Sequence, residues 1–233
     1  MPLPPPSGLY DPSYEHDACG VGFVATLNGR PSHAIVRYGI QILLNLVHRG
    51  ATGSDPLTGD GAGLLIQVPH AFFERECHNL SLDLPPAGKY GVGLIFLPQN
   101  PDQRRRCEQI VEDKILATGQ RLIGWRDVPI NENACGPLAR KTMPVIRQVI
   151  IGSAARDERS FERKLFVIRR WAENTVRSSD LEERRKFYIP SLSSRTLVYK
   201  GLLLAEQLGE FYLDLKDELV VSQLAMVHQR FST

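Results

Sequence analysis

The sequence predicts a layered α/β or α+β domain with mostly antiparallel sheets. Strand-like segments are numerous and the helical patterns fall in separate blocks, so the strict β-α-β alternation of a doubly wound fold is absent. The 233 residues are 42% hydrophobic, which is typical of a packed globular protein and sufficient for one substantial domain or two small ones. No internal repeat or linker divides residues 19–233.

Alternating apolar residues predict the strands. In CGVGFVAT, residues 19–26, the alternation falls on Val21, Phe23 and Ala25 and indicates the first strand. A second strand is expected at LLIQV, directly after a glycine-rich turn. The further strand-like segments are 90–97, 121–128, 144–151, 195–203 and 222–231.

Helical spacing of apolar residues predicts three helices, within 33–50, 100–119 and 157–179. Gly50 and Gly119 are suitable stops for the first two, because glycine readily adopts the conformation that ends a helix. Within 33–50 the apolar positions are Ile35, Ile42 and Leu46. Within 100–119 Pro101 is the expected first residue, and the apolar positions are Cys107, Ile110 and Ile115. Within 157–179 the apolar positions are Phe161, Leu165, Ile168 and Trp171 or Ala172.

The charge balance does not indicate a nucleic-acid or membrane partner. The chain has 28 basic and 26 acidic residues, and its arginine-rich segments are interleaved with acids. The Pro-rich opening lacks the apolar core of a secretory signal, and no apolar run approaches the roughly 20 residues of a membrane span. A cytoplasmic protein is therefore expected.

The cysteines, Cys19, Cys77, Cys107 and Cys135, include no C-x-x-C pair, which argues against a zinc site or a disulfide framework. Cys19, followed by Gly20, is by itself compatible with a buried structural thiol. If residues 1–18 were removed, however, its own α-amino group, with a pKa of about 7.7 to 8, could activate the thiol as a nucleophile. Both interpretations stay open on these residues alone.

Two further segments carry candidate binding residues. The turn GATGSDPLTGDGAG lacks the lysine of a phosphate loop and the ligand pattern of a calcium loop, and its glycines suit a shaped structural turn. Arg49, just before it, is well placed to hold a carboxylate or backbone carbonyls. The segment LAMVHQRFST ends in Arg230 with Ser232 and Thr233, which suits a small-molecule carboxylate, although an arginine at a solvated edge would look the same. We interpret His228 as a hydrogen-bonded core or rim residue.

Taken together, five ordered segments resemble the N-terminal glutamine amidotransferase domain of glutamate synthases, and they span essentially all of the chain after residue 18. They are HDACGVGF, HRGATGSDPLTGDGAG, FERKLFVIRRWAEN, FYIPSLSSRTLVYKGLL and VHQRFST. The resemblance implies a four-layer αββα N-terminal-nucleophile hydrolase sandwich with mostly antiparallel sheets. It also implies that residues 1–18 are a propeptide-like leader and that 19–233 are the class II amidotransferase domain.

The same resemblance implies the chemistry and the site. Processed Cys19 would attack the side-chain amide of L-glutamine, releasing ammonia, and water would hydrolyse the γ-glutamyl thioester to glutamate. Arg230 matches the residue that holds the substrate α-carboxylate, Thr233 belongs to the adjoining substrate-binding segment, and Arg49 is a further substrate-binding candidate. Cys135, also followed by glycine, lies where the family has no nucleophile and is expected to be structural.

One departure from the family pattern concerns the end of the chain. The family's oxyanion-stabilising Asn-Gly pair and a substrate-binding aspartate lie beyond the segment that ends at Thr233. Loss of one oxyanion donor costs on the order of 10²- to 10³-fold in rate, so this fragment alone is expected to be a very poor glutaminase. The domain is thus expected to be incomplete at its C-terminus.

The resemblance places the remaining chemistry outside this segment. Later synthase domains would hold FMN and an iron-sulfur cluster and join the ammonia to 2-oxoglutarate, with a small electron-donating subunit as a further partner. No cofactor or metal is expected within residues 1–233. Two alternatives stay open: a class II amidotransferase that serves another acceptor, and a non-catalytic binding or interface module of the same fold.

Overall fold

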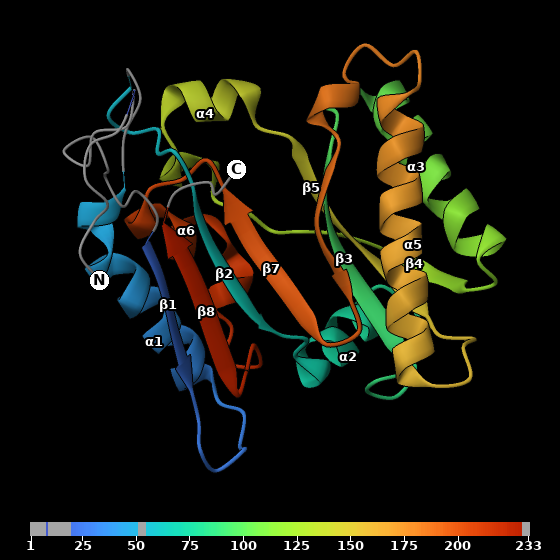
Figure 1. The fold of residues 1–233 in the computed structure, drawn as a ribbon, viewed down its shortest axis with the longest axis horizontal. Helices are drawn as coiled ribbons and strands as arrows, with labels where there is room; N and C mark the ends of the chain where they lie inside the picture. Colours follow the sequence, from blue (N-terminus) through green and yellow to red (C-terminus); the bar gives the residue numbers. More distant parts are fainter. Residues whose placement is uncertain (1–7, 9–19, 51–54, 230–233) are drawn as a thin grey trace.

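The computed structural model describes residues 8, 20–50 and 55–229, which form two four-stranded antiparallel sheets with helices packed against them (Figure 1). Sheet 1 has the strand order β1-β8-β2-β7, and sheet 2 has the order β4-β5-β3-β6. The strands are β1 Gly20–Ala25, β2 Ala62–Gln67, β3 Tyr90–Leu97, β4 Arg121–Asp127, β5 Val145–Gly152, β6 Tyr188–Ser193, β7 Thr196–Gly201 and β8 Leu224–Gln229. This confirms the α+β class with antiparallel sheets and is consistent with an N-terminal-nucleophile hydrolase sandwich.

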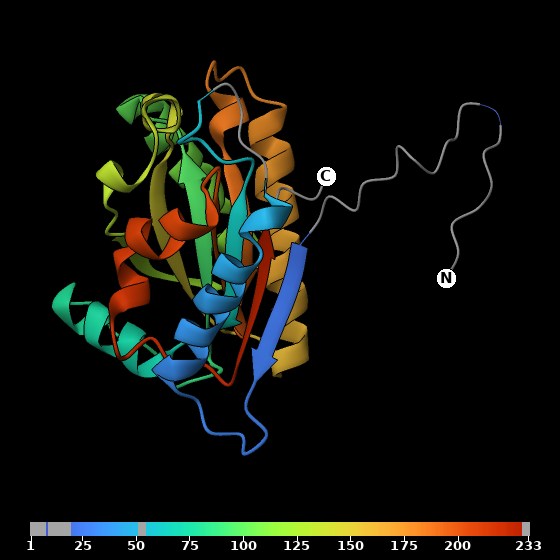
Figure 2. The same ribbon diagram turned by 90° about the vertical axis from the view of Figure 1, so that its left-hand side faces the viewer.

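The helices form two groups. The α-helices are α1 His33–Asn45, α2 His70–Asn79, α3 Pro101–Ala117, α4 Pro137–Thr142, α5 Glu158–Arg177 and α6 Ala205–Phe211. Short 3-10 turns are η2 Val47–Arg49, η3 Glu132–Ala134, η4 Arg184–Lys186 and η5 Leu213–Lys216. Helices α3 and α5 lie together beside sheet 2, whereas α1 and α6 lie on the side of sheet 1 (Figures 1 and 2). Among the described residues, no helix is both long and apolar enough to cross a bilayer.

Two hydrophobic cores follow from this arrangement. The first lies between sheet 1, helices α1, α2 and α6, and one face of sheet 2, with Leu64 and Tyr90 among its fully buried members. The second lies between the other face of sheet 2 and helices α3 and α5, and includes Val111 and Leu165. Because β3 contributes alternate residues to both cores, sheet 2 is covered on both faces.

The predicted helices are present with small differences. The segment 33–50 forms α1 followed by η2, and Gly50 ends it. Asn100 caps α3 by accepting hydrogen bonds from two backbone N–H groups, with Pro101 as first residue. Of the two alternatives on α5, Ala172 is buried and Trp171 is 44% exposed. Helices α2, α4 and α6 and strand β6 have no counterpart in the sequence prediction.

Close approach of α1 to sheet 1 explains the glycines of the first strand. A Cβ on Gly22 would lie 2.4 Å from a side-chain carbon of Ile42, and a Cβ on Gly39 would lie 2.7 Å from that of Ala225. In β1, the neighbours of Gly22, Val21 and Phe23, point to the opposite face and are 63% and 73% exposed. The strand was therefore predicted correctly, but its apolar alternation does not mark the side that α1 covers.

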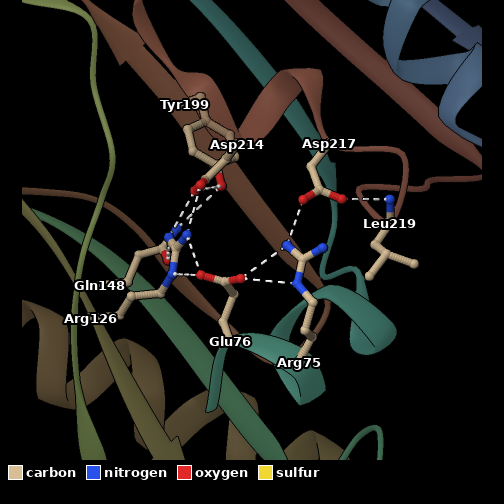
Figure 3. A network of polar contacts seen from close by, with 8 residues as sticks. All are labelled: Arg75, Glu76, Arg126, Gln148, Tyr199, Asp214, Asp217 and Leu219. Atoms are coloured by element: carbon tan, nitrogen blue, oxygen red, sulfur yellow. Dashed lines mark hydrogen bonds and ion pairs between the residues drawn. The ribbon is translucent and has the colours of Figure 1, made fainter. Parts of the chain in front are cut away.

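A buried polar network connects the two sheets (Figure 3). The Arg126 guanidinium on β4 donates to both carboxylate oxygens of Asp214 in η5, at 2.9 and 2.8 Å. It also donates to Gln148 of β5 at 3.0 Å and to Glu76 of α2 at 2.9 Å. The Tyr199 hydroxyl on β7 donates to Asp214 at 2.9 Å, so both sheets share this carboxylate.

Because this network is buried, the stability of the fold depends on both of its charges. Arg126 and Asp214 are only 5% and 2% exposed, so neither charge is hydrated and each depends on the other for compensation. Burial opposes the positive charge of Arg126, but the hydrogen bond and charge of Asp214 outweigh it and raise the pKa of the guanidinium. Burial, reinforced by the Asp214 charge, raises the pKa of Tyr199 well above its ordinary value, so this hydroxyl remains a donor.

Removing one charge from the network is expected to destabilise the fold strongly. We expect Arg126→Met to lower the free energy of unfolding by about 3 to 5 kcal/mol, because Asp214 would remain buried without a counter-charge. Urea denaturation of the full-length protein, followed by a probe in this domain, would measure it. The control is Arg105→Met, whose ion pair with Asp102 is solvent-exposed and whose loss should cost no more than about 1 kcal/mol. Equal losses in the two variants would contradict the assigned role.

Candidate active site

Four strand ends meet in one row at the same end of sheet 1. Gly20 of β1 pairs with Gln229 of β8, Gln229 pairs with Ala62 of β2, and Ala62 pairs with Gly201 of β7. Gly20 directly follows Cys19 in the sequence, and Gln229 directly precedes Arg230. The predicted site residues Cys19, Arg230 and Thr233 themselves lie outside the described residues.

Arg49 is the one predicted site residue that the structure describes. It is the last residue of η2 and is partly buried. A Cβ on Gly20 would lie 3.0 Å from the Arg49 Cβ and 3.3 Å from its Cγ, so the stem of Arg49 rests directly on the residue that follows Cys19. The Arg49 side chain makes no hydrogen bond or ion pair with another described residue, and its backbone N–H donates to the Leu46 carbonyl at 2.8 Å.

Gln229 is a buried polar residue that the sequence patterns did not identify. Its side chain is 2% exposed, and its Oε1 atom is buried without a hydrogen-bond partner among the described residues. It borders a cavity of about 350 Å³. The other described residues that line this cavity are Val47, Gly50, Pro56, Leu204, Ala205 and Glu206. Since buried polar atoms are rarely unpaired, this oxygen is an acceptor placed beside the row of strand ends.

The described part of the glycine-rich turn is held by its own polar groups. Asp55 accepts hydrogen bonds from the backbone N–H of Leu57 at 3.0 Å and from the Thr58 hydroxyl at 2.8 Å. These bonds lower the pKa of the exposed Asp55 carboxyl. Gly61 has a φ of 134°, a conformation that favours glycine. The expectation of a shaped turn is met by residues 55–61.

Two distant segments support this turn by close backbone contact. A Cβ on Gly59 would lie 2.4 Å from the Leu203 carbonyl oxygen, and a Cβ on Gly136 would lie 2.8 Å from that of Leu57. The Gln207 side chain donates to the Leu57 carbonyl at 2.8 Å. The sequence patterns did not predict helix α6, which carries Gln207, because this helix is short and its apolar pattern is interrupted by a glycine.

His228 and the three described cysteines are held in structural surroundings. His228 is partly buried, and its ring lies against Gly63, whose Cβ would come within 2.1 Å of Nε2. Cys135 is buried and its thiol donates to the Glu132 carbonyl. Burial raises the pKa of Cys77 to about 11 and that of Cys107 to about 12. The part of the chain that the structure describes contains no cluster of His, Cys, Asp and Glu suited to a metal ion.

Two antiparallel sheets with flanking helices, and a first strand whose start adjoins a candidate nucleophile, define an α+β protein of the N-terminal-nucleophile hydrolase class. The family described as glutamine amidotransferases class-II matches residues 19–233. The chain belongs to this family.

Similar proteins include glutamate synthases with different electron donors in their names. The large chain of glutamate synthase (NADPH) from Bacillus subtilis (strain 168) is 50% identical over 233 residues, covering 99% of this chain and 15% of that protein. The corresponding protein of Azospirillum brasilense is 45% identical, covering 97% and 15%. Ferredoxin-dependent glutamate synthase 1 of Arabidopsis thaliana is 40% identical, covering 99% and 14%. The chain therefore spans about one seventh of the length of these relatives.

The contact at Gly59 gives a test of the turn. We expect Gly59→Ala to lower the free energy of unfolding by about 1 to 3 kcal/mol, because the added methyl group would overlap the backbone at Leu203. Chemical denaturation would measure the change. Gly209→Ala is the control: its Cβ would make ordinary contacts of 3.4 and 3.6 Å with Ile40, and alanine favours the helix. The packing account fails if both variants are as stable as the parent.

Proposed function

We propose that this chain is the amidotransferase part of a glutamate synthase, hydrolysing L-glutamine to glutamate and ammonia for a synthase domain elsewhere in the polypeptide. The observation that supports the proposal best is the pairing of Gly20 with Gln229 at one end of sheet 1, because these residues adjoin Cys19 and Arg230 in the sequence. These segments are separated by more than two hundred residues in the sequence. The names and high identity of the relatives support glutamate synthase over an amidotransferase with another acceptor.

The proposal includes removal of residues 1–18, so that 19–233 form the amidotransferase domain. The family match supports this division because it begins at Cys19. The freed α-amino group would accept the thiol proton as the Cys19 sulfur attacks the side-chain amide carbon of glutamine. The carbon–nitrogen bond then breaks, and the amino group returns the proton to the departing ammonia. Water hydrolyses the resulting thioester, which gives glutamate and restores the thiol.

Three residues are proposed to hold the substrate. Arg230 would bind the α-carboxylate through its planar guanidinium, which can donate two parallel hydrogen bonds to one carboxylate. Thr233 would contribute from the adjoining segment. Arg49 would reinforce the positive potential beside Cys19, since its side chain rests on Gly20 and has no carboxylate partner among the described residues.

The proposal places the electron-transfer chemistry outside this chain. FMN and an iron-sulfur cluster would belong to the synthase domains, and a small subunit would deliver electrons. The described cysteines do not fit a cluster, because Cys77 and Cys107 are buried in different cores and Cys135 bonds to its local backbone. A cytoplasmic location is part of the same proposal.

The nucleophile assignment can be tested by mass and by labelling. In full-length protein purified from its source, N-terminal sequencing is expected to begin at Cys19, and a diazoketone analogue of glutamine is expected to label that residue. Cys77 and Cys107 serve as internal controls: with pKa values of about 11 and 12, about one thiol in a thousand or fewer would be ionised at pH 8.

The opposite result would contradict the assignment of Cys19 as the nucleophile. If the protein retained its leader and Cys19 took no label, the cysteine nitrogen would be an amide that cannot act as a base. The chain would then be a non-catalytic module of the same fold.

The role of Arg230 predicts a binding defect. In the full-length enzyme, Arg230→Met is expected to raise KM for glutamine roughly 10- to 150-fold, because hydrogen bonds to a charged group contribute about 1.5 to 3 kcal/mol. Steady-state glutaminase assays would measure this. Arg195→Met, which removes an exposed arginine paired with Glu158, is the control and should leave KM unchanged. An unchanged KM for Arg230→Met would exclude a contact with the substrate.

A further inference from the structure

A second and larger depression lies away from the row of strand ends. It is a groove of about 1040 Å³ between the end of β7, helix α5, η4 and the segment that joins α4 to β5. Its lining includes several apolar side chains that also belong to or pack against the two cores. These are Phe96, Ile146, Phe187, Leu203 and Phe211. We call this depression the basic groove because most of its charged lining residues are cationic.

The basic groove concentrates positive charge. Six cationic side chains line it, against one carboxylate, that of Glu173. The six are Arg169, Arg170 and Arg177 of α5, Arg184 and Arg185 of η4, and Lys200 of β7. Across the whole chain basic and acidic residues are nearly balanced, at 28 and 26, so this excess is local.

Three of the six cationic side chains have no carboxylate partner among the described residues. Glu173 is 7% exposed and is already held by Arg170 at 2.8 Å and by Arg169 at 3.5 Å. The side chains of Arg177 and Arg185 make no hydrogen bond or ion pair with another described residue, and the Arg184 guanidinium donates only to the Leu181 carbonyl. Burial, together with repulsion from Arg169, lowers the pKa of Lys200. Guanidinium groups beside an apolar floor favour a ligand that carries both carboxylates and apolar groups.

The position of the groove indicates where such a ligand comes from. Gly201, on its edge, belongs to the row that contains Gln229, with β2 between the two strands. Adjacent strands lie about 4.8 Å apart, so β8 ends roughly 10 Å from the groove. The relatives are several times longer than this chain, which supplies ample polypeptide to reach it.

We propose that the basic groove binds an acidic segment of the same polypeptide, from the part beyond residue 233. The inference rests on the proposed function, in which this chain is one part of a longer synthase. Aspartate or glutamate side chains of that segment pair with Arg177, Arg184 and Arg185, and its apolar side chains cover the floor at Phe187 and Leu203. Leu203 also contacts Gly59, so the docked segment lies one residue from the glycine-rich turn.

The test uses the full-length protein and two positions on the same helix. Arg177 lines the groove and Arg163 does not, and both are exposed here. In full-length Arg177→Cys, alkylation of the introduced thiol by iodoacetamide, followed by peptide mass spectrometry, is expected to be at least tenfold slower than in full-length Arg163→Cys. Equal rates would mean that the groove is open to solvent and would overturn the proposal.

A second variant keeps the charge and identifies the occupant. Full-length Arg185→Lys, treated with a carbodiimide, is expected to form an amide between the new amine and an Asp or Glu after residue 233 of the same chain.

A cross-link only between isotopically distinct copies would assign the groove to a second copy instead. Protection of the Arg177→Cys thiol that appears only with added nucleotide would assign it to a small anion. Either result would overturn the proposal. Both readouts are independent of glutaminase activity and of Cys19 labelling, so failure of the proposed function is recognised separately.

Discussion

The buried pair of Arg126 and Asp214 is the interaction on which the rest of the structure depends. Hydrophobic burial brings the sheets together but is not directional, so it does not by itself determine how β4 and β5 face β7. A buried guanidinium imposes direction, because every unpaired donor would cost free energy. Its donors are satisfied only when η5, β5 and α2 are all in place, and Tyr199 adds the contact from sheet 1.

The position of β7 links this network to both sites. Tyr199, which bonds to Asp214, lies two residues before Gly201, where β7 joins the row of strand ends. Beyond it, Leu203 contacts Gly59 on one side and the basic groove on the other. Any shift of β7 would therefore move the support of the glycine-rich turn and the edge of the groove together. The network is therefore connected through β7 to the row of strand ends and to the edge of the groove.

Local patterns in the sequence predicted local structure well. Most strands, and the long helices α3 and α5, were found from periodicity and end signals, because apolar spacing reports which face a neighbour covers. Strand β6 was missed: its sequence YIPSLS contains Pro190, which argues against a strand, and β6 is in fact an edge strand, where proline is tolerated. The pairing of Arg126 with Asp214 had no local signal, since the two residues are 88 positions apart. Gln229 was missed because its burial depends on strands and turns from three parts of the chain.

The motif CGVGF shows why a site motif and a packing motif can coincide. Its glycines are explained without reference to catalysis: Gly22 admits Ile42 of α1, and Gly20 admits the stem of Arg49. Helix α1 is followed directly by η2, which brings Arg49 beside the start of β1. Gly20 therefore allows Arg49 to lie against the start of β1. A larger residue at Gly20 would push the side chain of Arg49 away from the strand, so the packing of this motif alone requires a glycine there.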